Sequence, residues 1–320
     1  MNREINEIFE EIRAFRIQGA TNIARAIISV LIKYKDEIIK QSDNKEEFLR
    51  NIKNIAKKLT IAQPVESMAQ NIIGFIIFDL QDPKIESLDD CKKVMNETTA
   101  KLNDTIEKNE KEFIKNGTKL IESMTKKTRT LNIFTHCYSS GVRSILEKTD
   151  NRNIDFKIFN IETRPVLQGR TAAKKLSDIG ISVTMCLDSA APFIISNKSD
   201  RKLDIDLVLI GADSISLNGS AMNKTGGYSM SLSAFHEKIP FYVVTSLLKV
   251  KKGFSSFIDI PIETKSFREI WPEAPMGVNI MNLAFDTIPS EFITGFITEF
   301  GILKPEEIKD AVRKNYPRLM

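Results

Sequence analysis

Four short apolar runs in the second half of the sequence are each followed directly by polar or ionisable residues. The residues that follow these runs include Cys137, Arg164, Asp188 and Asp213. The carboxyl ends of parallel strands meet at one edge of a sheet, and ligands bind just outside that edge. Because four separate runs deliver such groups, we predict a single pocket built around Cys137 and Asp213.

Cys137 stands where an apolar run ends and a helical pattern begins. Free N–H groups at a helix N-terminus favour a thiolate, so a reactive thiol is one interpretation, and a small buried apolar side chain is the other. Cys91 and Cys186 lack this setting. An odd and sparse set of cysteines indicates a reducing compartment and no disulfide framework.

Asp213 follows an apolar run and is flanked by small residues. Partial burial would raise the pKa of its carboxyl group and suit it to general acid catalysis near neutral pH. A helix cap or a turn is the alternative. Downstream, the segment Asn223-Lys224-Thr225-Gly226-Gly227 suits an anion held by backbone N–H groups and a point charge, or else a plain connector.

The elements that position these residues show two different periodicities. Apolar runs at 131–135, 156–161, 181–187, 205–211 and 240–246 alternate with helical patterns near 139–148, 169–179, 188–196 and 225–237. This alternation is typical of βαβ units and a parallel sheet. The tail carries apolar residues over 285–302 and is expected to pack back onto the sheet.

Residues 1–125 repeat apolar side chains at helical spacing instead. We predict helices after Gly19, over 45–59, after Pro64 with that proline near the first turn, and over 89–115. The expected fold class is therefore α/β, with an N-terminal helical domain over 1–125 followed by a Rossmann-like parallel-sheet domain over 126–320.

The bulk composition excludes several classes of protein. Of the 320 residues, 42% are hydrophobic and 28% charged, and the net charge of +4 is spread along the chain, which gives no sign of direct nucleic-acid binding. The first residues do not form a signal peptide, and no apolar stretch is long enough to cross a membrane, so we expect a cytoplasmic protein. His136 and His236 lack partners at zinc-ligand spacing, so no metal site is expected.

Six stretches carry a joint pattern of motifs in a fixed order, and a seventh, FRIQGATNIARA (15–26), precedes them. The six are THCYSS (135–140), ETRPVLQGRTAAKKL (162–176), LDSA (187–190), GADSISLNGSAMNKTGG (211–227), PFYV (240–243) and MNLAFDTIPSEFITGFITEFGIL (281–303). Together they resemble the family of sugar-phosphate aldose–ketose isomerases that shares its fold with the α, β and δ regulatory subunits of translation initiation factor 2B. The resemblance covers nearly the whole chain after residue 15.

The resemblance implies a reaction and a set of site residues. The enzymes of the family carry a cysteine after the first strand and an aspartate after the fourth, which Cys137 and Asp213 match. The implied reaction opens a ring-closed aldose 1-phosphate to a ketose 1-phosphate without metal or organic cofactor, and the closest likeness is to archaeal ribose 1,5-bisphosphate isomerase, which forms ribulose 1,5-bisphosphate. Asp213 would be the acid, and Cys137 would be the base of an enediol path or assist a hydride shift. The implied substrate contacts are Gly19, Ala20, Ser139, Arg164, Asn223, Lys224 and Lys249.

Two departures from the family pattern keep other functions open. Gln18 and Gln63 stand where the enzymes usually have phosphate-binding arginines. Each lost charge-assisted contact costs about 1.5–3 kcal/mol unless Arg16, Arg25 or Lys249 compensates. The alternatives are a non-catalytic regulatory subunit related to initiation factor 2B, with initiation factor 2 as partner, and an isomerase for a deoxy or thio sugar phosphate. The resemblance also implies a homo-oligomer, either a dimer or a hexamer.

Overall fold

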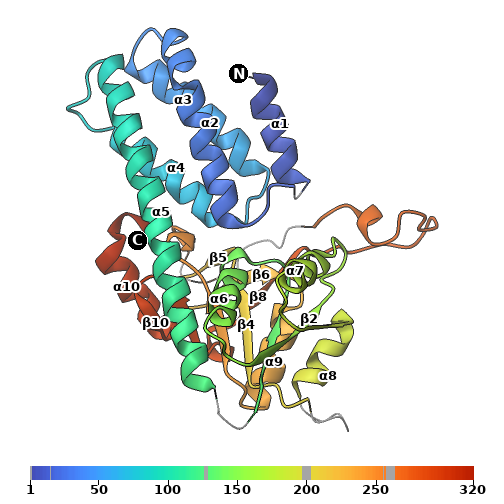
Figure 1. Cartoon of the computed structure of the whole chain (residues 1–320). Helices are drawn as coiled ribbons and strands as arrows, with labels where there is room; N and C mark the ends of the chain where they lie inside the picture. Colours follow the sequence, from blue (N-terminus) through green and yellow to red (C-terminus); the bar gives the residue numbers. More distant parts are fainter. Residues whose placement is uncertain (1, 15, 126–128, 197–202, 255, 257–263) are drawn as a thin grey trace.

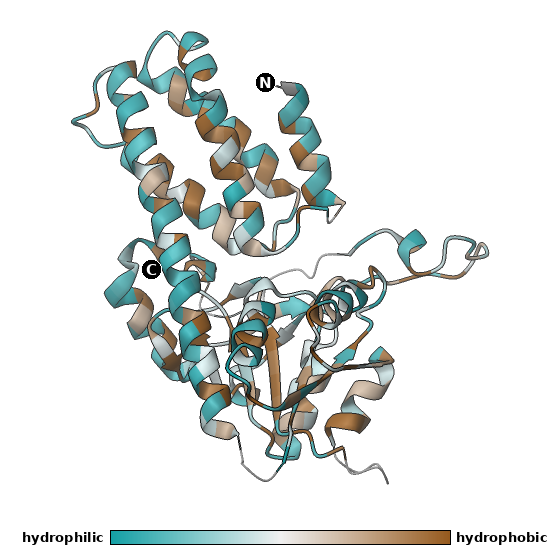
Figure 2. Ribbon diagram, in the orientation of Figure 1, coloured by the Kyte–Doolittle hydropathy of each residue, from teal (hydrophilic) through white to brown (hydrophobic). Residues whose placement is uncertain are grey.

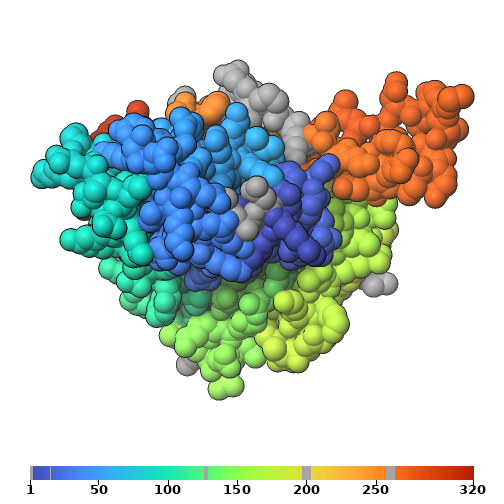
Figure 3. All heavy atoms as spheres, turned by 90° about the horizontal axis from the view of Figure 1, so that it is seen from above, coloured from blue at the N-terminus to red at the C-terminus, as the bar shows by residue number. Residues whose placement is uncertain are grey.

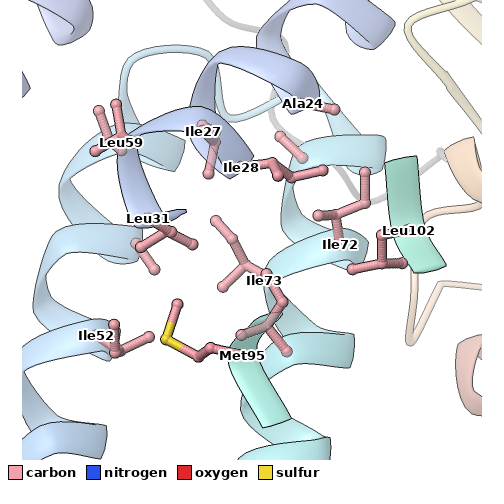
Figure 4. Close-up of a cluster of buried hydrophobic side chains, with 14 of the residues drawn as sticks. Ala24, Ile27, Ile28, Leu31, Ile52, Leu59, Ile72, Ile73, Met95 and Leu102 are labelled. Atoms are coloured by element: carbon pink, nitrogen blue, oxygen red, sulfur yellow. The ribbon is translucent and has the colours of Figure 1, made fainter. Parts of the chain in front are cut away.

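The first part of the chain forms a bundle of helices (Figure 1). The computed structural model describes residues 2–14, 16–125, 129–196, 203–254, 256 and 264–320. The helices are α1 (Asn2–Arg13), α2 (Ala20–Lys40), α3 (Lys45–Ile61), α4 (Ser67–Leu80) and α5 (Leu88–Met124). Side chains of α2, α3, α4 and α5 meet in one apolar core, in which Leu31, Ile52 and Met95 are buried (Figure 4). The predicted helical periodicity is confirmed here.

The boundaries of these helices have local causes. Asn44 caps α3 by accepting a hydrogen bond from the N–H of Glu47, and Ser87 with Asp90 forms a capping box at the start of α5. Helix α4 begins at Ser67, three residues after Pro64, so the expected position of Pro64 near the first turn is wrong. A turn over 64–66 separates the proline from the helix and turns out to supply a site residue.

A seven-stranded sheet forms the second part, with strand order β10-β9-β7-β4-β1-β2-β3. The strands are β1 (Leu131–Thr135), β2 (Phe156–Ile161), β3 (Val183–Cys186), β4 (Leu207–Gly211), β7 (Phe241–Val244), β9 (Gly295–Thr298) and β10 (Gly301–Leu303). All neighbouring strands are parallel except β10, which is antiparallel to β9. The central strand β4 is apolar and buried along its length (Figure 2). The α/β fold class is confirmed.

Helices cover both faces of this sheet, as a buried parallel sheet requires. They are α6 (Ser140–Asp150), α7 (Gln168–Ser177), α8 (Ala191–Ile195), α9 (Gly227–His236) and α10 (Ile308–Asn315). The five predicted apolar runs became β1, β2, β3, β4 and β7, and the tail does pack back onto the sheet, because β9 pairs with β7.

A second, antiparallel sheet was not predicted from the sequence. Its strand order is β5-β6-β8, with β5 (Ser214–Ile215), β6 (Ala221–Lys224) and β8 (Phe285–Ile288). Asn223 and Lys224 therefore lie in a buried strand rather than in a connector. Strand pairing with the distant β8 fixes both side chains beside the edge of the main sheet.

Helix α5 packs against both parts of the molecule. Its early residues, Met95 and Ile106 among them, belong to the helical core, whereas Phe113 and Ile121 pack with the sheet. None of the helices in the described part of the chain is long and apolar enough to cross a membrane.

A buried carboxyl group joins α5, the end of β7 and the C-terminal helix. Glu299, in the turn between β9 and β10, accepts hydrogen bonds from Asn109 Nδ2 (3.0 Å), Ser246 Oγ (2.9 Å) and the N–H of Leu247 (3.1 Å). Tyr316 Oη lies 3.3 Å from the same oxygen. Burial outweighs these donors and raises the pKa of Glu299 to about 7.

We expect Glu299→Gln to remove a pH dependence of stability. Between the unfolded pKa of 4.5 and the folded pKa of about 7, folded protein retains a proton that unfolded protein has released. The stability contribution of Glu299 is therefore complete below pH 4.5 and declines as pH rises to about 7, by roughly 3 kcal/mol. Urea unfolding of wild type and variant at pH 4.5, 6 and 8 should show a difference that changes with pH. A constant difference would contradict the assignment.

Candidate active site

A cavity opens where the carboxyl ends of β1, β4 and β7 face the N-termini of α2 and α4. Its empty volume, which includes the open mouth, is about 760 Å³. Eight of the nine residues predicted for the site line it: Gly19, Ala20, Cys137, Ser139, Asp213, Asn223, Lys224 and Lys249. The sheet thus gathers side chains that lie as far apart as residues 19 and 249.

Arg164 is the predicted residue that the structure places elsewhere. Its side chain is exposed, and it is not among the residues that line the cavity. The carboxylate of Asp188 accepts hydrogen bonds from the N–H groups of Thr163 (2.7 Å) and Arg164 (2.6 Å), which holds the loop after β2. Asp188 is therefore a structural residue of that loop.

Cys137 is held in an unusual backbone conformation at the end of β1. Its φ of 62° lies in the left-handed region, and its N–H donates to Thr163 Oγ1 (3.0 Å). The thiol donates to Gln168 Oε1 (3.4 Å), and Gln168 Nε2 in turn donates to Gln18 Oε1 (2.6 Å). This chain of hydrogen bonds runs from the segment before α2 through α7 to the sulfur.

Of the two interpretations of Cys137, the structure favours the buried, protonated thiol over the reactive thiolate. Burial raises its pKa to about 12, with Lys224 opposing and Asp213 reinforcing the shift. Helix α6 begins only at Ser140, and Ser139 Oγ accepts the N–H of Val142 as its N-cap. One N–H of the helix start is thus taken by a side chain, and burial remains the largest influence on the thiol.

Two lysines bring positive charge into the cavity. Lys224 is 4% exposed, and its Nζ lies 4.2 Å from the centroid of the Phe285 ring. Lys249 Nζ donates to the carbonyl oxygen of Ala212 (2.7 Å), next to Asp213. The Nδ2 of Asn223 is buried and has no hydrogen-bond partner among the described residues, so it is ready to donate to a ligand.

The Thr225-Gly226-Gly227 segment binds a carboxylate of the protein where the sequence predicted a bound anion. Asp286 Oδ2, from β8, accepts hydrogen bonds from the N–H groups of Gly226 (2.8 Å) and Tyr228 (3.1 Å). These N–H groups are therefore not available to a bound phosphate. The Nε2 of His136 lies 3.2 Å from the carbonyl oxygen of Thr225, so its ring does not pair with Cys137.

The N-terminus of α2 is the free anion-binding element of the cavity. Gly19 adopts a φ of 85° and precedes the helix without a side-chain cap, so the first N–H groups of α2 face the cavity. Such groups and the helix dipole favour a bound anion. Arg16 and Arg25 do not line the cavity and are ion-paired with Glu11 (2.7 Å) and Glu110 (2.5 Å).

Glu66 is a site residue that was missed from the sequence. It lies in the turn before α4, is 2% exposed and lines the cavity. Its carboxyl group lies beside that of Asp213, within reach of a hydrogen bond between the two. This turn follows no predicted strand, and its signal in the sequence is an acidic residue directly before an apolar helix.

The chemistry available in this cavity is proton transfer next to a bound anion. Two carboxyl groups, two ammonium groups, a neutral thiol and an unpaired amide converge in one buried space. Within the described ranges, no three His, Cys, Asp or Glu side chains are grouped as a metal site needs.

Comparison with known proteins extends this description. The model of the initiation factor 2 subunit family matches residues 16–305. The chain belongs to this family. It is 30% identical over 306 residues to ribose 1,5-bisphosphate isomerase of Methanocaldococcus jannaschii, covering 94% of this chain and 92% of that protein. It is also 30% identical over 327 residues to methylthioribose-1-phosphate isomerase of Trichoplax adhaerens, covering 97% and 88%.

A solved structure shows the same fold. The translation initiation factor eIF-2B of Pyrococcus horikoshii OT3 superimposes with a TM-score of 0.73 at 24% identity, over 94% of this chain and 97% of that chain. Proteins with names from metabolism and from translation thus share this architecture, and fold alone does not decide between them.

Proposed function

We propose that this protein is an aldose–ketose isomerase acting on a sugar 1-phosphate, with ribose 1,5-bisphosphate as the leading substrate. The observation that carries the proposal is that Cys137 and Asp213 line one cavity together with Lys224, Lys249 and the open N-terminus of α2. The near full-length similarity to two sugar-phosphate isomerases supports it.

The proposed roles follow from the positions of the groups. The C1 phosphate would bind the N–H groups of Gly19 and Ala20, with Lys224 and Lys249 as cations. Asn223 would donate to a sugar hydroxyl through its unpaired Nδ2. Asp213 would protonate the ring oxygen, because a sugar phosphorylated at C1 must be opened before hydrogen can move from C2 to C1.

The test is turnover by the purified protein. Ribose 1,5-bisphosphate is incubated with wild type, and ribulose 1,5-bisphosphate is followed by chromatography, with 5-methylthioribose 1-phosphate and a 5-deoxy analogue in parallel. The expected result is turnover of at least one substrate, fastest for the bisphosphate. If none of the three compounds is converted, the proposal is wrong. If an analogue is converted faster than the bisphosphate, that analogue is the better substrate.

A second candidate is a regulatory subunit related to initiation factor 2B. The observation that favours it is the state of two cavity residues: Gln63 Nε2 donates to the carbonyl oxygen of Ile12 (3.0 Å), and Gln18 is bonded to Gln168. Neither side chain supplies a cation for phosphate. A pull-down with initiation factor 2 tests this role, and absence of binding together with robust turnover removes it.

We propose that the chain works as a homo-oligomer, a dimer as the simplest case, in the cytoplasm. The edge strand β3 leaves Leu187 64% exposed, and Phe193 and Phe235 on α8 and α9 are also exposed. A segment closed at its base by the Thr264–Leu283 bridge projects from the body and exposes Trp271 (Figures 1 and 3). Exposed apolar surface of this kind marks a contact site. Light scattering should give a multiple of 36.3 kDa, and a monomer would contradict the proposal.

A further inference from the structure

The buried carboxyl group of Glu66 has no structural task in its own helix. Glu66 occupies the N-cap position of α4, yet its side chain accepts no capping hydrogen bond. Ser214 Oγ takes that place, accepting the N–H of Ser67 (3.3 Å) and lying 2.6 Å from Ser67 Oγ. Glu66 Oε2 is buried and takes no hydrogen bond from an amide, ammonium or alcohol group of the described residues. Burying such a carboxyl group is costly, so its presence calls for a function.

The partner of Glu66 is the proposed acid itself. Its carboxyl group lies within reach of a hydrogen bond to Asp213, which is only partly buried and faces the cavity. Two carboxyl groups can form a hydrogen bond only if one of them carries a proton. Burial and the neighbouring Asp213 raise the pKa of Glu66 well above its usual value, while Lys249 and Lys224 oppose that shift. The pair therefore holds a proton to higher pH than an isolated glutamate would.

The charges around the pair come from every element packed against it. Lys249 follows β7, Lys224 lies in β6, and the neutral thiol of Cys137 follows β1. The two ammonium groups can compensate the pair after it has given up its proton. The thiol is already committed to Gln168, and burial keeps it protonated, so it is poorly placed to accept a proton.

We propose that Glu66 is a positioning residue that keeps one proton on the Glu66–Asp213 pair, so that Asp213 serves as both acid and base in the isomerisation. This inference rests on the proposed function. Asp213 donates its proton to the ring oxygen, and the C1–O bond of the ring breaks. The C2 hydrogen moves to C1 with its electron pair, the C2 hydroxyl becomes a carbonyl group, and its proton returns to the pair. The Glu66–Asp213 pair thus gives up one proton and regains one in each turnover, and Cys137 does not need to ionise.

The decisive variant is Glu66→Gln, which keeps size and removes the second ionisable group. Glutamine cannot hold the proton that the two carboxyl groups share, so the fall in kcat on the alkaline side should begin at least about one pH unit lower. We expect kcat near pH 7 to fall about tenfold or more, to recover as pH is lowered, and KM to change little. Glu66→Asp should restore part of the wild-type profile.

Ser67→Ala is the matched control, because it removes a hydrogen bond at the same helix start and leaves both carboxyl groups. It should lower Tm without moving the pH profile of kcat. If Glu66→Gln lowers kcat equally at every pH, Glu66 is only structural and the inference is wrong.

Infrared spectroscopy separates this inference from the proposed function. The carbonyl stretch of a protonated carboxyl group should appear near neutral pH in the wild type minus Glu66→Gln difference spectrum, with or without turnover. If this carbonyl band is present but no sugar phosphate is converted, the isomerase function is rejected and the proton shared by Glu66 and Asp213 is supported. Turnover without the band would reject the role of Glu66.

Discussion

Asp213→Asn is expected to lower kcat for the sugar phosphate by about 10²–10⁴-fold, the usual contribution of a positioned general acid. Asparagine keeps the shape of the side chain and can still contact Glu66, but it cannot release a proton to the ring oxygen. Because the interaction acts in the transition state, kcat and kcat/KM should fall together while KM stays near its wild-type value. Steady-state kinetics at several pH values measures all three quantities.

Asp178→Asn provides the comparison for this variant. Asp178 is exposed at the end of α7 and pairs with Lys174 on the same helix (3.1 Å). Its replacement should leave kcat unchanged and stability nearly so, because exposed pairs contribute little. If Asp213→Asn behaves like Asp178→Asn, Asp213 is not the acid.

Gly169→Ala is expected to destabilise the fold by roughly 3 kcal/mol or more, at the upper end for overpacking. A Cβ at this position would lie 1.7 Å from the carbonyl oxygen of Ile161, which is backbone at the end of β2. The carbonyl of Gly169 also accepts Asn160 Nδ2 (2.8 Å), so α7 cannot move away without losing a buried hydrogen bond. Urea unfolding monitored by circular dichroism measures the loss. Displacement of α7 should also move Gln168 and loosen the thiol of Cys137.

Gly74→Ala is the counterpart in open space. Gly74 is exposed within α4, and a Cβ there meets nothing within 4 Å. Alanine should stabilise the helix by about 0.5–1 kcal/mol, because it restricts the unfolded chain and favours helix. Equal effects at Gly74 and Gly169 would show that helix propensity, and not the approach of α7 to β2, governs the second site.

The elements that could be predicted are those encoded by local patterns. The strands at 131–135 and 156–161 match the structure residue for residue, since buried parallel strands are short unbroken apolar runs. The antiparallel strands β5, β6 and β8 escaped prediction because β5 has only two residues and β6 has four, too few for a periodicity. The pairing of β6 with β8 joins residues more than 60 positions apart, which no local window contains.

The same distinction between local and long-range patterns separates the site residues that could be predicted from those that could not. Cys137 and Asp213 were found because polar residues after buried strands meet at one edge by the geometry of a parallel sheet. Glu66 was missed because it comes from a turn of the helical part, which is brought to that edge only when the start of α4 packs against β5. The anion expected at Gly226 is Asp286, which comes from a strand 60 residues away.

By itself, then, the sequence determined the class of fold and the two residues at the centre of the cavity, because both follow from short-range patterns of apolar and polar side chains. Only the tertiary structure decided the protonation states. Burial raises the pKa of Cys137 to about 12, which decides between the thiolate and the buried thiol that the sequence left open, and it raises the pKa of Glu66 beside Asp213. A pKa depends on desolvation and on charges a few ångströms away in space, and neither is written in the order of residues along the chain.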